Sequence, residues 1–303
     1  MRDNKPTKRE VYEIVTDRII ERMEQGAIPW ERPWNPAIGL PRNIQGRQYR
    51  GINVWILGAQ GYESPVWLTF RQAKEMGGHV KASEKSTPVV FWKLLGRDQE
   101  EPDGSISHKV FPLMRYYNVF NLEQCADLPV KANDTVSPFA DRKPIEAAET
   151  IIAGMPLRPE IRETRHDEGK PPYYSSHLDY VDMPLKSQFP MLENWYSVLF
   201  HELGHSTGHP DRLNRKSLAE YGDVPGARNQ EELVAEFTSG YLCAVAGILD
   251  TRLSENKAAY IQSWLRAIKD DRKMLIVAAA QAQKAADYTL AVTEQPLELA
   301  EAA

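Results

Sequence analysis

The stretch Trp195-Tyr196-Ser197-Val198-Leu199-Phe200-His201-Glu202-Leu203-Gly204-His205 ends in the pattern HExxH. The apolar run before the pattern indicates a buried helix. Residues four apart on a helix lie on one face, about 6 Å from each other, so His201 and His205 can bind one metal ion while Glu202 reaches a water molecule on it. Two buried imidazoles without such a partner would be costly. The sequence therefore predicts a metal site with His201 and His205 as ligands and Glu202 as the catalytic base.

A third metal ligand is needed, because a catalytic zinc ion takes three protein ligands and leaves one position open. Glu232 is the preferred candidate, since Glu232 and Glu236 resemble the ExxxD pair of gluzincins, in which the first carboxylate binds metal and the second orients a histidine. Asp211 is the rival, because the stretch from His201 also fits HExxHxxGxxD. The remaining alternatives are Glu236 and no third side chain. Glu232 also follows the helix cap Asn229 by three residues, where a glutamate is common in any helix. The expected cofactor is Zn²⁺ or another divalent metal such as Mn²⁺.

The chemistry expected of this site is peptide-bond hydrolysis, with Glu202 accepting a proton from water. Tyr174, His177 and Tyr221 are candidates for the donor that stabilises the oxyanion, and the sequence selects none of them. Residues 179–183 could form the edge strand against which a peptidase lays its substrate, although an ordinary structural strand explains them equally well.

The first half of the chain has a different character. The net charge of the whole chain is −5, but residues 42–93 hold eight basic residues against three acidic ones, and five of the seven tryptophans precede residue 93. Cations along the backbone and aromatic rings that stack on bases are what hold single-stranded nucleic acid, although a single aromatic ring is more commonly part of a core. We therefore expect this half to bind single-stranded DNA. The candidate DNA-binding residues are Trp67, Phe70, Arg71, Lys74, Lys85, Trp92, Lys93, Arg115 and Tyr116.

Periodicity and turn signals predict an α+β fold with two domains. The first domain, residues 1–128, is a small α+β module. Its elements are helices over 7–26, 52–59 and 70–76, and a hairpin of strands over 87–93 and 109–120. Residues 129–143 are polar and proline-rich, which indicates a linker.

The second domain, residues 144–303, is expected to be mainly helical and to carry the metal site. Its predicted helices cover residues 145–153, 192–207, 229–249 and 254–288, the last with a break near 270–271, and residues 294–303 are expected to be a frayed tail.

The composition fits an ordinary globular chain. Apolar residues make up 42% and charged residues 26% of the sequence, a balance that excludes dominant disorder. No apolar run approaches the roughly 20 residues that a transmembrane helix needs, and the first residues do not resemble a signal peptide. We therefore expect a cytoplasmic protein without a membrane partner. Cys125 and Cys243 are too few for a disulfide framework and are expected to be buried thiols.

Several motifs resemble those of ArdC-type antirestriction proteins. The stretches that resemble the N-terminal domain of this family, which also occurs in TraC-type plasmid primases, are Arg50–Trp55, Trp67–Ala73, Lys85–Trp92 and Tyr116–Asn121. The stretches that are similar to the zincin-like metallopeptidase domain of the family are His201–His209 with Arg212-Leu213, and Glu231–Glu236. The resemblance covers most of residues 7–265.

The resemblance implies a plasmid-encoded protein that binds single-stranded DNA and protects conjugatively transferred DNA from host restriction. It also implies that His201 and His205 are metal ligands and that Glu202 is the catalytic glutamate. The second domain further resembles the proteases of DNA-protein crosslink repair. Three functions remain open: a DNA-tethered peptidase with an unidentified protein substrate, a DNA-binding shield whose metal site is not catalytic, and a general cytosolic peptidase. A structural zinc site would need a fourth Cys or His, and only His209 is near, which favours an open catalytic site.

Overall fold

The computed structural model describes residues 8–26, 28, 30, 39–100, 106–129, 143–167, 169–249 and 257–292. The predicted linker therefore lies outside the described residues, apart from Pro129 and Lys143 at its ends. The predicted tail over 294–303 and the turn at the tip of the hairpin also lie outside them.

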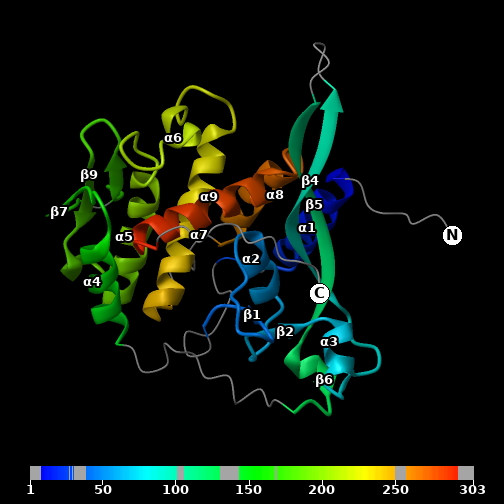
Figure 1. Cartoon of the computed structure of the whole chain (residues 1–303). Helices are drawn as coiled ribbons and strands as arrows, with labels where there is room; N and C mark the ends of the chain where they lie inside the picture. Colours follow the sequence, from blue (N-terminus) through cyan, green and yellow to red (C-terminus); the bar gives the residue numbers. More distant parts are fainter. Residues whose placement is uncertain are drawn as a thin grey trace.

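The first half of the chain combines helices α1 (Lys8–Glu24), α2 (Ile52–Gly58) and α3 (Phe70–Glu75) with two sheets (Figure 1). One sheet has the strand order β1 (Arg42–Asn43), β2 (Val66–Leu68), β5 (Ile106–Asn121) and β4 (Thr87–Glu100). The other pairs β3 (His79–Val80) with β6 (Cys125–Ala126), which follows the 3-10 turn η1 (Leu122–Gln124). The predicted helices of this half are all present. α3 has its predicted capping box, in which the side chain of Thr69 accepts from the amide of Gln72 and the side chain of Gln72 accepts from the amide of Thr69.

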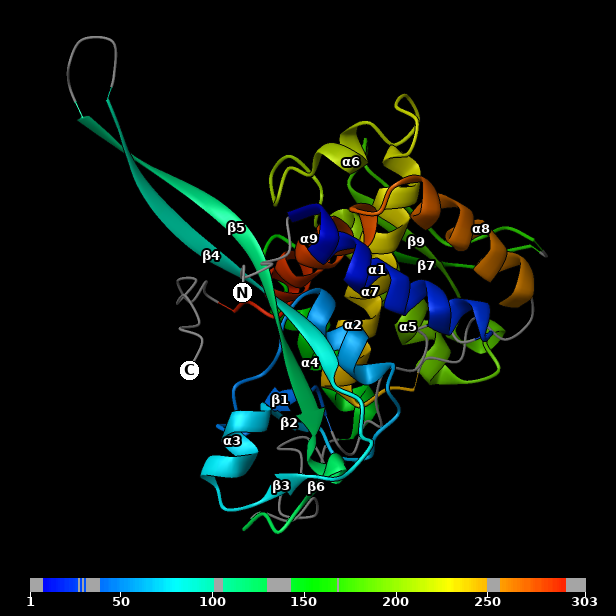
Figure 2. The same cartoon turned by 90° about the vertical axis from the view of Figure 1, so that its right-hand side faces the viewer.

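Strands β4 and β5 form the predicted hairpin, which is longer than expected. They pair from Thr87 opposite Val119 out to Glu100 opposite Ile106. Figure 2 shows the outer part of this hairpin extending away from the rest of the molecule. Near its base, Met114 lies in the main hydrophobic core, whereas Val89 packs with Trp67 in a separate small cluster. Side chains alternate between the two sides along each strand, so Met114 and Val89 point to opposite faces of the hairpin. Both faces of the hairpin base are therefore covered.

The second half places helices around a small sheet. The sheet has the order β7 (Glu160–Thr164), β9 (Tyr180–Pro184) and β8 (Tyr173–Ser175), and the helices and turns are α4 (Pro144–Gly154), η3 (Lys186–Gln188), α5 (Leu192–Ser206), α6 (Lys216–Ala219), α7 (Ala227–Ala246), α8 (Lys257–Asp270) and α9 (Met274–Thr289). The predicted helices are confirmed, including the break between α8 and α9. Of the two alternatives for residues 179–183, the structure has the ordinary structural strand and not the edge strand, because β9 pairs on both sides and β7 and β8 are the edges.

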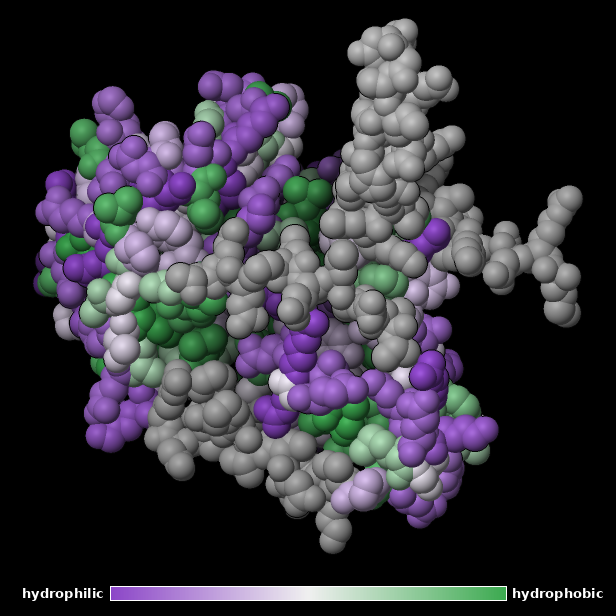
Figure 3. Space-filling model, viewed as in Figure 1, coloured by the Kyte–Doolittle hydropathy of each residue, from purple (hydrophilic) through white to green (hydrophobic). Residues whose placement is uncertain are grey.

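The surface and the cysteines agree with the composition. On the face of Figure 3, the side chains over α6 are mostly hydrophilic, and hydrophobic ones gather where α4, α7 and α9 approach each other. Cys125 and Cys243 are buried and are not joined in a disulfide, as expected. Among the helices that the structure describes, none is long and apolar enough to cross a membrane.

Helices from the two halves of the chain share one hydrophobic core. Trp55 of α2 stacks on Phe237 of α7 with ring centroids 5.0 Å apart, and Trp30 contacts the same ring edge-on at 5.2 Å. The hydroxyl of Tyr241 in α7 donates a 2.7 Å hydrogen bond to the carbonyl of Gly51. Figure 2 also shows α1 lying alongside α8. The division of the chain at residues 129–143 stays a prediction, and the packing of the described residues continues across it.

The contact between α2 and α7 gives a test of this shared core. A Cβ atom at Gly240 would lie 2.5 Å from Cη2 of Trp55, so we expect Gly240→Ala to lower the free energy of unfolding by about 1–3 kcal/mol. Alanine alone would favour the helix by about 1 kcal/mol, so a net loss reports the clash. Urea unfolding of the full chain measures the change. Gly154→Ala in α4 is the control, because nothing lies within 4 Å of its Cβ position. An equal midpoint for Gly240→Ala and the wild type would contradict the packing.

Candidate metal centre

The candidate site lies where α5 crosses α7. A Cβ atom at Gly204 would lie 3.1 Å from Cα of Ala235 and 3.2 Å from Cβ of Thr238, so a glycine is what lets the two helices approach this closely. On α5, the apolar residues Leu199, Phe200 and Leu203 are buried in the core. The other face of α5 presents its two histidines to α7, where glutamate side chains can reach them.

The three predicted ligands come together in the structure. Nε2 of His201 lies 3.2 Å from Nε2 of His205. Oε2 of Glu232 lies 3.5 Å from Nε2 of His201 and 3.8 Å from Nε2 of His205. Within the part of the chain that the structure describes, this is the one group of three or more His, Cys, Asp or Glu side chains close enough to hold a metal ion. The rival ligand Asp211 has a side chain that is 80% exposed and contacts His209 instead.

Two more carboxylates from α7 lie on the far side of the imidazole rings. Oε1 of Glu231 is 3.2 Å from Nδ1 of His205, and Oε1 of Glu236 is 3.7 Å from Nδ1 of His201. In the neutral tautomer with the proton on Nδ1, each ring would turn that proton toward its carboxylate and leave Nε2 available to a metal ion. Glu236 thus lies where an orienting carboxylate was expected. Glu231 was not singled out in the sequence, because consecutive helical residues point about 100° apart and a ligand at Glu232 does not place its neighbour at the same site.

The electrostatics of the site keep the carboxylates charged. Burial raises the pKa of Glu232, but the hydrogen bond and charge of His201 and the charge of His205 outweigh it and lower the pKa to about 2. Burial likewise raises the pKa of Glu231, and Arg215 and His205 lower it to about 2. Burial and the neighbouring Glu232 raise the pKa of Tyr221 to about 12. Tyr221 is therefore a neutral donor at ordinary pH, and its hydroxyl donates to Oε1 of Glu232.

The ligand group opens into a cleft of about 560 Å³. The walls of the cleft come from the region of β8, from α5 and α7, and from α6 with the segment that follows it. The lining residues include Pro171, Pro172, Tyr173, Tyr174, Ser176, Glu202, Leu218, Tyr221 and Arg228. Among the three candidate oxyanion donors, Tyr174 and Tyr221 line the cleft, whereas His177 is exposed outside it. The hydroxyl of Tyr174 already donates to Asp179 and accepts from Arg212.

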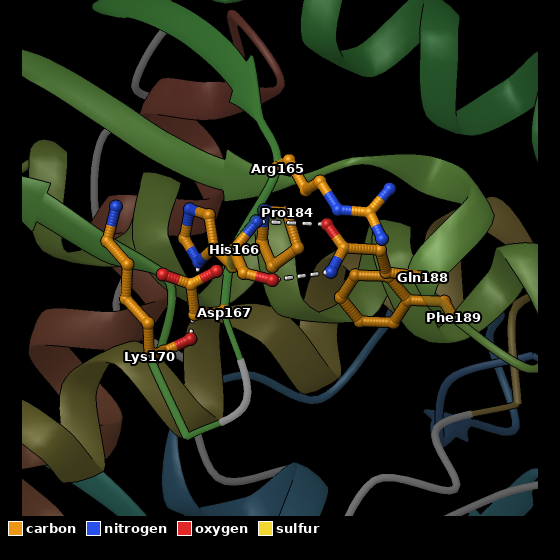
Figure 4. Close-up of a pocket in the computed structure, with 7 residues that line it drawn as sticks. All are labelled: Arg165, His166, Asp167, Lys170, Pro184, Gln188 and Phe189. Atoms are coloured by element: carbon orange, nitrogen blue, oxygen red, sulfur yellow. Dashed lines mark hydrogen bonds between the residues drawn. The ribbon is translucent and has the colours of Figure 1, made fainter.

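A second recess, of about 450 Å³, lies against β7 and η3 and contains none of the candidate metal ligands (Figure 4). The side chain of Gln188 closes one wall by accepting from the amide of His166 at 3.1 Å and donating to its carbonyl at 2.7 Å. The buried carboxylate of Asp182 lies 3.2 Å from Nε2 of His166 and 2.8 Å from Nζ of Lys170. These contacts hold the chain just before Pro171 and so support the rim of the first cleft.

The predicted DNA-binding residues do not form one continuous surface. Trp67 is a correction: its side chain is 2% exposed and packs in the core, so its ring cannot stack on a base. Phe70 is 59% exposed at the start of α3, and Trp92 is 39% exposed on β4.

The basic candidates are equally dispersed. Arg71 and Lys74 lie exposed on α3, and Lys85 lies exposed just before β4. Arg115 and Tyr116 are neighbours on β5 and therefore point to opposite faces of the hairpin. Lys93 belongs to β4, and its side chain lies outside what the structure describes.

Both halves of the chain match known protein families. Residues 9–120 match the N-terminal domain of anti-restriction factor ArdC, and residues 147–281 match a zincin-like metallopeptidase. The prediction of a small α+β module followed by a zincin-like domain is thereby confirmed.

Relatives match both parts together. Two proteins named DNA primase TraC, from Escherichia coli, are 34% and 32% identical over 96% and 98% of this chain, which spans only 28% and 21% of their lengths. An uncharacterised protein of Sinorhizobium fredii is 33% identical over 93% of this chain and 92% of its own length.

Two solved structures extend the likeness to three dimensions. The crystal structure of the antirestriction protein ArdC from plasmid R388 without metal is 35% identical, with a TM-score of 0.73, over 94% of this chain and 99% of that one. Its Mn(II)-bound structure is 36% identical over the same shares, with a TM-score of 0.70. On the identity and coverage of these relatives, the chain belongs to the ArdC family of antirestriction proteins.

Proposed function

We propose that this protein binds single-stranded DNA and hydrolyses peptide bonds at a divalent metal site formed by His201, His205 and Glu232, with Glu202 as the general base. Through these activities it protects incoming conjugative DNA from host restriction in the cytoplasm. The observation that carries the proposal is the convergence of two imidazole Nε2 atoms and one carboxylate oxygen at the wall of an open cleft.

The donor atoms fit a metal ion in number, type and spacing. Ligand bonds of 2.0–2.1 Å in a tetrahedral site place neighbouring donors about 3.3 Å apart, and the three separations here are 3.2, 3.5 and 3.8 Å. Glu231 and Glu236 face the Nδ1 atoms of His205 and His201, and a proton on each Nδ1 leaves both Nε2 lone pairs available to one cation. The cleft also has three carboxylates, Glu202, Glu232 and Glu236, against one arginine. The Mn(II)-bound relative supports a divalent ion.

The side chains around this site suit amide hydrolysis. A bound divalent metal supplies Lewis-acid polarisation of a peptide carbonyl and activation of a water molecule. Glu202, on the turn of α5 that carries both histidines, accepts the proton from water and passes it to the leaving nitrogen. Tyr221 keeps its hydroxyl proton at neutral pH and holds Glu232 so that Oε2 faces the two imidazoles. When substrate enters, the same hydroxyl is the best placed donor for the oxyanion.

The edge strand β8 gives the substrate chain a place to lie. β8 pairs with β9 along one side, and Tyr173 and Tyr174 of β8 line the cleft. An extended peptide can add to the open side of β8 by backbone hydrogen bonds, and it then passes in front of the histidines. Backbone hydrogen bonds do not depend on the side chains of the peptide. Such a mode suits a peptidase that acts on whichever protein is bound to the same DNA strand.

DNA binding is assigned to the unit built from α3 and the β3–β6 sheet. Phe70 projects its ring into solvent, 6.4 Å from the ring of Phe120, and offers a base a stacking face. Lys74 and Lys85 lie exposed in the same unit, which has its own small hydrophobic cluster. The charge of Arg71 is partly neutralised by Glu75 at 2.7 Å, so we expect it to contribute less.

Metal binding and catalysis can be separated by two substitutions. We expect the purified full chain to bind about one divalent ion, His201→Ala to lose it, and Glu202→Gln to keep it while losing proteolysis, because Glu202 moves a proton but is not a ligand. Elemental analysis and cleavage of a protein bound to single-stranded DNA are the measurements. His177→Ala, which removes an exposed histidine outside the cleft, should change neither. A wild-type chain that binds no Zn²⁺ or Mn²⁺ at micromolar concentration would overturn the metal site, and proteolysis retained by Glu202→Gln would overturn the base.

Base stacking by Phe70 predicts a loss of affinity for single strands. Phe70→Ala should weaken binding of a single-stranded oligonucleotide by about 1–3 kcal/mol, roughly 5- to 150-fold. Lys74→Ala and Lys85→Ala should each reduce the slope of log affinity against log salt by about 0.7. Fluorescence anisotropy of the full chain measures both effects. Leu178→Ala, which truncates an apolar side chain that is 63% exposed in the second half, is the control. Equal affinity of Phe70→Ala and the wild type would exclude this ring as a stacking platform.

A further inference from the structure

We propose that Arg215 is a positioning residue of the metal site: it holds the carboxylate of Glu231, which in turn fixes the imidazole of His205 with Nε2 facing His201 and Glu232. This inference rests on the proposed function only in treating His205 as a metal ligand. Arg215 touches neither metal ligand atoms nor the cleft, and it follows the HExxH pattern by ten residues, beyond any helical spacing.

Arg215 pairs with Glu231 through two parallel hydrogen bonds. Its Nε donates to Oε2 of Glu231 at 2.9 Å, and its Nη2 donates to Oε1 at 2.5 Å. Both side chains are buried, at 3% and 0% exposure. A bidentate pair of this kind fixes the plane of the carboxylate as well as its position. The hydroxyl of Ser217 donates a third bond to Oε2 at 2.6 Å.

The same guanidinium also forms hydrogen bonds with the C-terminal end of α5, the helix that carries the histidines. Nη2 of Arg215 reaches the carbonyls of Gly204 at 2.8 Å and His205 at 3.3 Å, and Nη1 donates to Oγ1 of Thr207 at 2.7 Å. A cation at this position is favourable, because the last carbonyls of a helix lack partners within the helix. The backbone of His205 and the carboxylate that faces its ring are therefore held by one rigid group.

This arrangement decides which ring nitrogen of His205 carries the proton. Oε1 of Glu231 faces Nδ1 of His205 at 3.2 Å, so a fixed, charged carboxylate there selects the tautomer with Nδ1 protonated and Nε2 bare. Without Arg215, Glu231 would lose two of its donors in a buried position and would rotate toward other partners or water. His205 would then populate both tautomers, and only one of them presents a lone pair to a metal.

The guanidinium of Arg215 lies directly against Gly208. A Cβ atom at Gly208 would lie 2.9 Å from Nη2 and 3.1 Å from Cζ of Arg215. Gly208 therefore provides the space that lets the guanidinium lie flat between α5 and α7.

Arg212 is a matched control that the chain itself supplies. It lies on the same turn, its side chain is 1% exposed, and it also holds the end of α5, donating to the carbonyl of Ser206 at 2.6 Å. Its carboxylate partner is Asp179 rather than Glu231, with Nη1 3.0 Å from Oδ2 of Asp179. Loss of Arg212 removes a comparable buried cation without touching Glu231 or His205.

The test compares Arg215→Met with Arg212→Met in the full chain. The first readout is the tautomer of His205 in the metal-free protein, measured from the ¹⁵N shifts of its two ring nitrogens. We expect the wild type and Arg212→Met to show Nδ1 protonated and Nε2 bare, and Arg215→Met to show a mixture. The second readout is affinity for Zn²⁺ and Co²⁺, measured by chelator competition and by the visible spectrum of bound Co²⁺. Arg215→Met should bind about 10- to 100-fold more weakly, and Arg212→Met should bind like the wild type.

A double variant tests whether Arg215 acts through Glu231. Adding Arg215→Met to Glu231→Gln should weaken metal binding by much less than Arg215→Met does in the wild type, because only the contacts of Arg215 with the end of α5 are then left to lose. Arg215→Lys, which keeps the charge but cannot form the bidentate pair, replaces Arg215→Met if the latter does not fold, and it should show an intermediate tautomer ratio. An unchanged tautomer and affinity in the Arg215 variant, equal losses in both arginine variants, or additive losses in the double variant would each overturn the proposal. A wild type that binds no metal would refute the proposed function, while the tautomer comparison would still decide the role of Arg215.

Discussion

The contact between α5 and α7 at Gly204 is the constraint on which the rest of the site depends. With hydrogen in place of a side chain, this residue lets α5 lie against Ala235, and the two helix backbones then come close enough for glutamate side chains to reach the imidazoles. One helix supplies both histidines and the base, and the other supplies Glu231, Glu232 and Glu236. Because both helices also form the core of the second half, the geometry of the site is set by the same packing that stabilises the fold.

The charged side chains of the site lie in successive shells around the two Nε2 atoms. The innermost carboxylate, Glu232, faces the two Nε2 atoms, and Glu231 and Glu236 face the opposite side of each ring. Arg215 neutralises Glu231 from behind, so a fully buried carboxylate is kept ionised next to a histidine. Buried charges persist in proteins when each has a partner in good geometry. Here each partner also fixes the orientation of the side chain that it contacts. The structure thus uses electrostatics for orientation as much as for stability.

Sequence reasoning found the helices and the inner ligands because both obey local rules. The i, i+4 spacing of His201 and His205 fixes their common face, and a second amphipathic helix offered Glu232. The role of Glu231 was not predictable, because it depends on Arg215 folding back from a turn, and a glutamate in the first turns of a helix has an ordinary explanation as a cap. Trp67 was wrongly predicted for a related reason. Composition does not distinguish a stacking ring from a core ring, and the residues that bury this one, Leu57, Val89 and Val119, come from other parts of the chain. The central place of β9 was left open because alternation along a strand does not show whether one or both of its edges are paired.

The stacking of Trp55 on Phe237 across the two halves has a consequence for how such proteins arise. A chain assembled by recombination near residues 129–143 would bring together an α2 and an α7 that had not been selected side by side, and the mismatch would fall in the centre of the molecule. The two halves are therefore expected to be inherited as a pair. The relatives agree, because each carries both halves, whether as nearly the whole protein or as a fraction of a much longer primase. In these relatives the two halves behave as one evolutionary unit.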